Sequence, residues 1–349
     1  IPSSDPIPVS WGWFQALLLL TFVLHLLFMN TMLGTGIIAL VSHLKRPKSS
    51  LPVTADISKR LPYTIAFTVN LGVPPLLFLQ VLYGHFFYVS SVLMAVYWIS
   101  IIALLILAYY SAYIYDFKYE TLGAARVIFI GTTVLILLFI GFLFTNNLTL
   151  MLHPEGWKAY FQRPGGTLLN LSDPTLIPRY LHFVTASLAV GGLSLALFGR
   201  FKRSGGMERQ RERIHLGLNW FCYATIVQMF IGLWFLMTLP SSTMGLFMGT
   251  SPLHSIVLLA GVAGAVLSLI FGFKKRVIPT AVSLVGTVVG MALMRELVRK
   301  AYLGPYFSLS SLKVIPQYSP LIMFLCSFAV GLSVVGFILW LAAKGRKEI

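Results

Sequence analysis

The sequence has little charge and almost no cysteine. Only 10% of its 349 residues are charged and only ten are acidic, whereas 57% are apolar. Soluble globular domains carry about 25% charged residues, so this composition excludes a soluble domain and favours a polytopic membrane protein. Cys222 and Cys326 both lie in apolar runs. Two such cysteines provide no CxxCH motif for covalent haem c and no thiolate cluster for zinc or iron–sulfur.

The apolar residues form nine runs long enough to cross a bilayer, which takes about 20 helical residues. We therefore expect one all-α transmembrane helix bundle over residues 1–349, without a separate soluble domain. The predicted spans are residues 11–42, 62–88, 92–115, 126–150, 178–199, 214–239, 252–273, 277–295 and 318–343. The second and third spans are separated only by the weak break Ser90-Ser91. The first span is too long for a signal peptide and lacks a basic leader, so we expect it to be a mature helix.

The 26 basic residues are distributed unevenly between the two sides of this bundle. Nineteen lie in the connections after the first, third, fifth and seventh spans and in the C-terminal tail. The other seven are Lys158, Arg163, Arg179, Arg295, Arg299, Lys300 and Lys313. The positive-inside rule then predicts an outer N-terminus and a cytoplasmic C-terminus, in a bacterial or archaeal inner membrane. Because the charge is spread over five segments at helix ends, we do not expect nucleic-acid binding.

Two connections on the predicted outer side are long enough to carry structure. They cover about 151–177 and 296–317. The first contains WKAYF, whose aromatic side chains are typical of a helix at headgroup level.

Four of the seven histidines fall at the middle or outer depth of four different spans: His25, His85, His182 and His254. One histidine in a membrane span is usually a hydrogen-bonded residue, but four at similar depth favour haem binding. Neutral imidazole is the commonest axial ligand of haem, and such sites are built inside helix bundles. Structural hydrogen bonding and a proton or ion relay are the alternatives.

The other three histidines are expected nearer to water. His43 and His215 lie beside basic residues, and we expect both to be solvated at the cytoplasmic interface. His153 lies in the outer connection, where a surface role is expected.

Nine of the ten acids are predicted in loops or tails, and only Glu296 reaches the bundle. One hypothesis is an ion-paired helix end, with Arg295 and Arg299 as neighbours. The other is a carboxylate that ligates a metal, while these arginines receive haem propionates, because guanidinium suits carboxylates in partly desolvated sites. Arg179, three residues before His182, would serve the same purpose.

Methionine is a further possible axial ligand, although in a membrane bundle it is mostly a packing residue. Six methionines are predicted to approach the outer half of the bundle: Met29, Met32, Met244, Met248, Met291 and Met294. We assign a ligand role to none of them from sequence alone.

Three segments resemble subunit I of the cytochrome bd quinol oxidases, in the wide sense of that superfamily. HLLFMNTMLG resembles the first-helix signature, whose histidine ligates the high-spin haem d. LNLSDPTLIPRYLHFVTASLAVGG resembles the entry to the fifth helix, where a histidine ligates low-spin haem b. MRELVRKAY resembles the Glu-x-x-Arg motif, whose glutamate ligates high-spin haem b. The resemblance therefore implies haem ligation by His25, His182 and Glu296, with Arg299 in the motif, and two or three haems b, of which one could be haem d-like.

The sequence also departs from that family. The second and third spans contain no acidic residue, where the oxidases place acids for proton delivery. The connection SSTMGLFMGTSP is short, where the oxidases have a long quinol-binding loop, and His254 takes the place of the expected methionine in the seventh helix. The resemblance thus implies haem binding more than oxygen reduction or the usual quinol site.

Together these patterns predict a membrane haem b electron-transfer subunit of a respiratory complex. It would pass electrons between the quinone pool, or a bound partner subunit, and the outer side, where a periplasmic cytochrome c or multihaem protein would dock. His182 and His254 form the expected low-spin pair, His25 and Glu296 serve the other haem or haems, and His85 is a further candidate ligand. One alternative is a divergent terminal oxidase, and another is a haem-free quinone-binding anchor or transporter.

Overall fold

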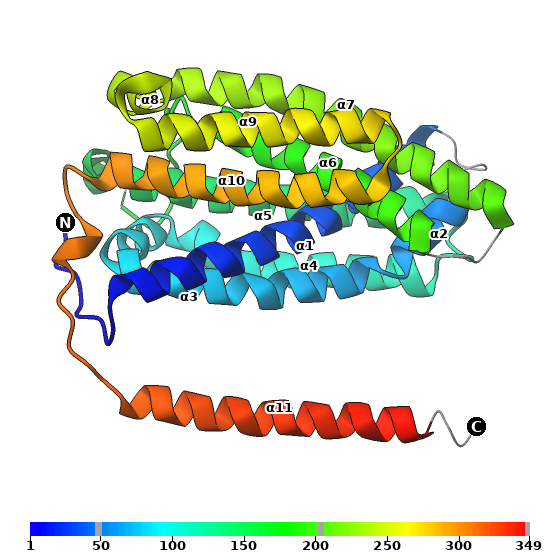
Figure 1. Cartoon of the computed structure of the whole chain (residues 1–349), viewed down its shortest axis with the longest axis horizontal. Helices are drawn as coiled ribbons and strands as arrows, with labels where there is room; N and C mark the ends of the chain where they lie inside the picture. Colours follow the sequence, from blue (N-terminus) through cyan, green and yellow to red (C-terminus); the bar gives the residue numbers. More distant parts are fainter. Residues whose placement is uncertain (46–50, 163, 202–205, 346–349) are drawn as a thin grey trace.

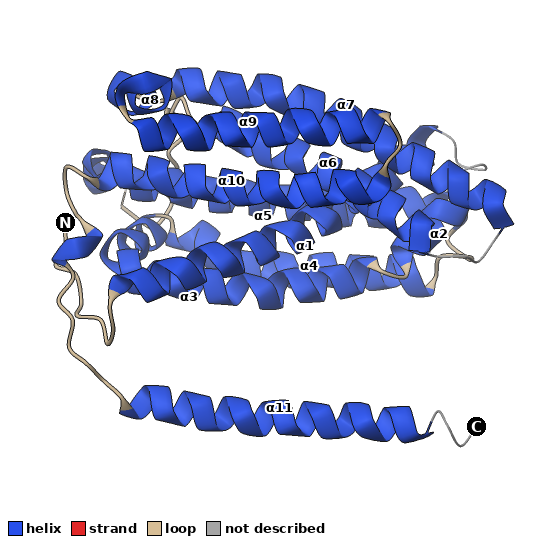
Figure 2. Ribbon diagram, viewed as in Figure 1, coloured by secondary structure: helices blue, strands red, loops and turns tan. Residues whose placement is uncertain are grey.

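The computed structural model describes residues 1–45, 51–162, 164–201 and 206–345 (Figure 1). In these residues the chain is helical, and the only β-type pairing is an isolated bridge between Ile7 and Val314 (Figure 2). The all-α prediction is confirmed. Several residues of the charge count lie outside the described part: Arg46, Lys48, Arg163, Lys202, Arg203, Arg346 and Lys347.

Nine helices within the described ranges are long and apolar enough to cross a membrane, as predicted. They are α1 (Trp11–Lys45), α3 (Leu61–Leu93), α4 (Ala95–Phe117), α5 (Arg126–Leu152), α6 (Leu176–Phe201), α7 (Gly206–Thr238), α9 (Pro252–Phe273), α10 (Val277–Leu303) and α11 (Ser319–Gly345). Long helices are the expected form because lipid offers no partner for backbone N–H and C=O groups.

Six shorter elements lie between the long helices. They are α2 (Leu51–Ser58), the 3₁₀ turns η1 (Gly123–Ala125), η2 (Pro154–Gln162) and η4 (Leu309–Ser311), the single turn α8 (Ser241–Gly245) and the π turn η3 (Leu246–Thr250). The WKAYF sequence lies in η2, so a helical segment is present in this connection, although it is of the 3₁₀ type.

Two helix boundaries differ from the prediction for identifiable reasons. The helix α3 continues through Ser90 and Ser91, because a helix accommodates serines whose hydroxyls donate to a carbonyl one turn earlier, and both hydroxyls donate to the carbonyl of Phe87. The break falls instead at Met94. The helix α10 continues to Leu303, two turns beyond the predicted end at residue 295. Its charged run RELVRK belongs to the helix rather than to the start of a loop; Glu296 and Arg299 are buried, whereas Lys300 is exposed.

Glycines allow three helices to pack backbone against backbone. A Cβ at Gly34 of α1 would lie 1.8 Å from the carbonyl oxygen of Ser187 in α6. A Cβ at Gly217 of α7 would lie 2.4 Å from the carbonyl oxygen of Gly192 in α6. Small residues at such crossings allow the close approach on which packing in a membrane depends. The helix α6 is therefore held between α1 and α7, which fixes the position of its histidine.

The two ends of the bundle are distinct. The N-terminus lies at the end where α1 begins and α10 ends, and the helix α11 ends at the opposite end (Figure 1). Following the orientation predicted from charge, we call these the outer end and the cytoplasmic end. The helix α11 lies beside the bundle, set apart from the other helices, and its membrane-spanning window is not buried against any of them.

At the cytoplasmic end, His43 is buried, so the expectation that it is solvated was wrong. Its Nε2 lies 2.8 Å from the hydroxyl of Tyr115, and the short helix α2 covers this region through Thr54, which bonds to Tyr119. His215 is exposed, as expected.

Candidate functional site

Glu296 lies where α1, α3 and α10 meet at the outer end, and its side chain is only 4% exposed. Its Oε1 accepts a hydrogen bond from the Tyr83 hydroxyl at 2.8 Å and a longer one from Gln15 Nε2 at 3.5 Å. Its Oε2 pairs with Arg299 one turn later. The backbone of α3 leaves helical geometry at Tyr83, with φ −132° and ψ 26°. The ion pair with Arg299 is present, but Glu296 lies two turns before the end of α10, so the expected helix end was wrong. Metal ligation by Glu296 stays a prediction.

Three arginines gather beside this carboxylate. Arg179 comes from α6, and Arg295 and Arg299 come from α10; the charge of Arg295 acts on both of the others. Each guanidinium also lies near an aromatic ring, for example Arg295 at 4.4 Å from the centroid of Phe22.

The arginine cluster has spare hydrogen-bonding capacity. Within the described residues, Arg179 Nε and Arg299 Nη2 are buried and have no hydrogen-bond partner. A buried donor left unpaired costs about 1–3 kcal/mol, and more when it is charged. The three positive charges outnumber the carboxylates of Glu296 and of Asp173, which also acts on Arg179, so a net positive charge remains in a region of low dielectric constant. This arrangement favours a buried anionic group.

His182 lies on the same face of α6 as Arg179, one turn further along the helix. Its Nε2 is 3.4 Å from the amide nitrogen of Gln228 in α7. Gly232, one turn later in α7, lies against the ring, since a Cβ there would be 3.2 Å from His182 Cε1. The Nδ1 atom of His182 is enclosed and has no partner within the described residues. The amide nitrogen of Gln228 also lies 3.9 Å from the sulfur of Met291 in α10.

His25 is held between α1 and α3 in a different way. Its Nδ1 lies 3.1 Å from the backbone carbonyl of Thr68, so Nδ1–H must be the donor and Nε2 carries the lone pair. Gly72 leaves room for the ring, because a Cβ there would lie 2.9 Å from His25 Cε1. A hydrogen bond from the second ring nitrogen to a backbone carbonyl is typical of metal-binding histidines. The charge of Arg295 acts on His25.

The other two candidate histidines lie away from this cluster. The ring of His85 packs between Phe86 and Phe307, with centroids 4.3 and 4.5 Å away. The Nδ1 of His254 lies 2.8 Å from Ser251 Oγ, and its ring packs against Phe247 within the same turn region. In the described structure these are the contacts of His254, and none reaches His182. Ligation by His85, and by His254 as the partner of His182, stays a prediction.

The outer connection carries its own ion pair. His153 follows α5 directly, and its Nδ1 lies 3.0 Å from Asp173 Oδ2 and from the Thr149 carbonyl. Burial opposes protonation of His153, but the hydrogen bond and charge of Asp173 outweigh it and raise the pKa of the imidazole. Burial likewise disfavours the Asp173 carboxylate, but hydrogen bonds from His153 and Thr175 lower its pKa. His153 is thus a partly buried anchor rather than the plain surface residue that we expected.

The sequence did not indicate the supporting residues of the site. Gln15 and Gln228 were detectable as polar residues in apolar runs, but Tyr83 is one of 15 tyrosines and carries no distinguishing pattern. Among the described residues, no group of three His, Cys, Asp or Glu side chains could hold a metal ion. A haem needs only one or two protein ligands to iron.

No family model matches the chain, and no curated protein matches it. Its function is therefore argued from the residues above.

Proposed function

We propose that the chain is a haem b electron-transfer subunit of a respiratory membrane complex, and a divergent member of the cytochrome bd subunit I superfamily. One observation carries the proposal: two buried nitrogens without partners lie one turn apart on the same face of α6, in the outer half of the bundle. His182 has an enclosed ring nitrogen without a partner, and Arg179, on the same helix face, has an unpartnered Nε. Buried polar atoms normally have partners, so the arrangement favours a ligand that supplies an anion to the arginine and a partner to the imidazole; as an iron ligand, His182 would exchange its Gln228 contact at Nε2 for the metal.

Haem meets both needs, because it carries an iron and two propionates. His182 and His25 would hold iron, and Arg179, Arg295 and Arg299 would receive propionates, since guanidinium pairs well with carboxylates. Beside His182, Met291 is a second-ligand candidate in addition to His254, because the Gln228 amide contacts both His182 and Met291. When bound, haem would supply reversible one-electron transfer.

The chain's own residues would set the properties of such a site. The Thr68 carbonyl orients the His25 ring and fixes its tautomer. Gly72 and Gly232 leave room beside the two imidazoles. The net positive charge of the arginine cluster would favour the reduced state of a neighbouring redox group.

The position of the site at the outer end supports exchange with a partner on that side. We infer a periplasmic cytochrome c or multihaem protein as this partner, quinol or quinone as the possible exchange partner within the membrane, and further membrane subunits of the complex. The bilayer contact itself follows from the nine apolar helices. The inner membrane of a bacterium or archaeon remains our inference from the charge pattern.

The test is a dithionite-reduced-minus-oxidised absorption spectrum of purified wild type and of two single variants. His182→Ala removes the imidazole beside the arginine cluster, and His215→Ala removes an exposed imidazole at the other end of the bundle. We expect His182→Ala to lose a low-spin haem b signal and His215→Ala to keep it. Equal spectra for the two variants would overturn the assignment of His182.

A second candidate is the haem-free quinone-binding anchor or transporter. The observation that favours it is Glu296, whose two oxygens are already paired with Tyr83, Gln15 and Arg299 without any metal. This candidate predicts a colourless protein. The divergent oxidase receives no such support, because α3 contains no acidic residue and α4 contains only Asp116, in its last turn at the cytoplasmic end.

A further inference from the structure

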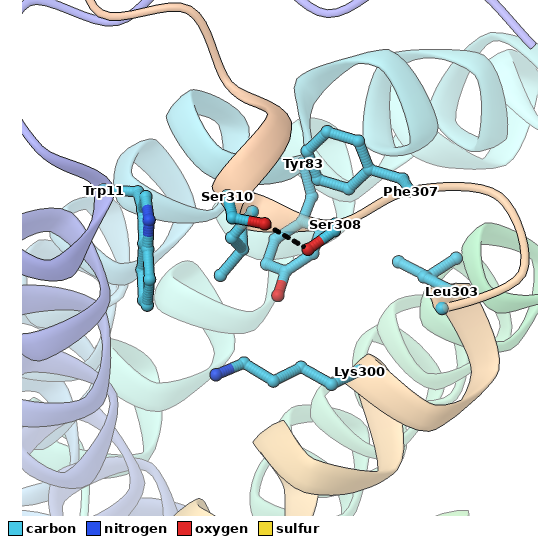
Figure 3. A pocket seen from close by; sticks show the side chains of 9 residues that line it. Trp11, Tyr83, Lys300, Leu303, Phe307, Ser308 and Ser310 are labelled. Atoms are coloured by element: carbon cyan, nitrogen blue, oxygen red, sulfur yellow. Dashed lines mark hydrogen bonds between the residues drawn. The ribbon is translucent and has the colours of Figure 1, made fainter.

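A cavity of about 360 Å³ opens at the outer end of the bundle, and none of the residues that line it is a histidine (Figure 3). It lies where the start of α1, the kinked part of α3, the end of α10 and the turn η4 meet. Its lining residues are Trp11, Tyr83, Lys300, Leu303, Gly304, Phe307, Ser308, Leu309 and Ser310. A cavity of this size falls at the lower end of the range of small-ligand sites, about 300–1,000 Å³.

The polar groups of this lining suit an anion. Lys300 is the one charged residue among them, and its Nζ lies 5.7 Å from the centroid of the Trp11 ring. The hydroxyls of Ser308 and Ser310 lie 2.8 Å apart, across the opening from the Lys300 ammonium (Figure 3). An ammonium and hydroxyl donors, with no carboxylate in the lining, match the acceptor oxygens of a phosphate group.

The charges behind the wall act in the same direction. Tyr83 lines the cavity and donates its hydroxyl hydrogen to the buried Glu296. That carboxylate is outweighed by Arg179, Arg295 and Arg299, so the region next to the cavity carries a net positive charge. Positive potential that is focused into a cleft with low-dielectric walls raises the local concentration of anions.

The position of the cavity indicates the source of the phosphate. The cavity lies at helix ends, where the membrane meets water, and Trp11 at its edge is a residue type enriched at that level. The N-terminal segment holds η4 in place nearby, since Ile7 exchanges backbone hydrogen bonds with Lys313 and Ile315, each at 2.9 Å. A ligand at this depth can keep its chains in the bilayer and its headgroup in the cavity.

We propose that this cavity binds the phosphate group of an anionic phospholipid headgroup in the outer leaflet. Lys300 neutralises the phosphate, Ser308 and Ser310 donate hydrogen bonds to it, and Trp11 and Phe307 contact the apolar part of the headgroup region. This proposal goes beyond the proposed function and does not depend on haem binding.

The test uses native mass spectrometry of the purified full chain, titrated with dioctanoyl-phosphatidylglycerol and, separately, with dioctanoyl-phosphatidylcholine. We expect the anionic lipid to bind at least about fivefold more tightly, because one lysine contributes about that factor toward an anionic lipid. Lys300→Gln should weaken phosphatidylglycerol binding about fivefold, and Lys300→Arg should retain it. The matched control is Lys313→Gln, an exposed lysine of the same connection that does not line the cavity.

A parallel titration with inorganic phosphate distinguishes the two sources of the group. Weak displacement of the lipid by phosphate supports the headgroup as the ligand. Binding of phosphate alone, with the same dependence on Lys300, supports the phosphate site but overturns the lipid as its source. Equal affinity of the wild type for the two lipids overturns the proposal, even if Lys300→Gln does not fold. Equal losses in Lys300→Gln and Lys313→Gln overturn it as well.

Discussion

His43 and His182 lie inside the same bundle but differ in the hydrogen-bond partners of their rings. At the cytoplasmic end, His43 bonds to Tyr115 and has the ring of Tyr119 beside it. Near the outer end, His182 meets only one amide, has a glycine beside its ring, and keeps an enclosed nitrogen without a partner in the described structure. The surrounding protein thus supplies the hydrogen-bond partner of the His43 ring. We propose that a ligand completes the surroundings of His182, and we therefore place function at the outer end.

The largest stability effect is expected at the ion pair of the outer end. Arg299→Leu leaves the carboxylate of Glu296 buried without its counter-charge, and breaking a buried pair from one side costs about 3–5 kcal/mol. The apparent melting temperature of the detergent-purified protein should fall sharply. A matched change at an exposed arginine of the cytoplasmic end, Arg276→Leu, should leave it nearly unchanged. Equal melting temperatures in the two variants would contradict the buried pair.

A smaller loss is expected at His43. His43→Phe keeps a ring of similar shape but removes the partner 2.8 Å from the Tyr115 hydroxyl. The lost hydrogen bond should cost about 1–3 kcal/mol, measured by thermal unfolding, while any haem spectrum stays as in wild type. A changed spectrum would show that His43 is not purely structural and would break the comparison with His182.

Arg179→Leu tests this comparison because its effect on stability should differ in sign between haem-free and haem-loaded protein. Without a bound anion, this change removes a buried, incompletely paired guanidinium, so the colourless protein should be unchanged or more stable by about 1 kcal/mol. In protein that carries haem, the same change should lower stability and haem retention, because a propionate loses its partner. Thermal unfolding of haem-loaded and haem-free preparations measures the change in stability in each case. A loss of the same size in both preparations would show that Arg179 is a packing residue.

The smallest effect is expected from the ion pair of the outer connection. Since the pKa of His153 is raised, its contribution is fully present below the ordinary value of 6.5 and is lost as pH rises through the folded value. Since the pKa of Asp173 is lowered, its contribution is present above 3.8 and is lost as pH falls through the folded value. Protection of residues 153–175 from hydrogen exchange should therefore be greatest between these values, after correction for the intrinsic exchange rate.

Two variants check the origin of that pH profile. His153→Gln should remove the decline above pH 6.5 and shift the acid-side decline to higher pH, because the hydrogen bond from His153 helps to lower the pKa of Asp173. His215→Gln, at an exposed imidazole of the cytoplasmic end, should reproduce the wild-type profile. A decline above pH 6.5 that persists in His153→Gln would assign it to another group.

The sequence predicted the helices better than their contacts. Each predicted span falls mainly on one long helix, because a continuous apolar run in lipid must satisfy its backbone hydrogen bonds internally. The third predicted span begins two residues before the break at Met94. The prediction failed at α10, where the charged run RELVRK resembled a loop but is helical, with Glu296 and Arg299 buried. It also failed at His43, because α2 covers this residue only in the folded structure. The contact between His182 and Gln228 could not be predicted, since helix spacing along the chain does not show which faces meet.

The central claim is that the unpartnered groups of the outer half bind haem. The most direct measurement is pyridine haemochrome quantitation of the purified wild-type protein, together with its reduced-minus-oxidised spectrum. We predict two or three haems b per chain. A preparation that is folded by thermal unfolding but has no Soret band would contradict the claim.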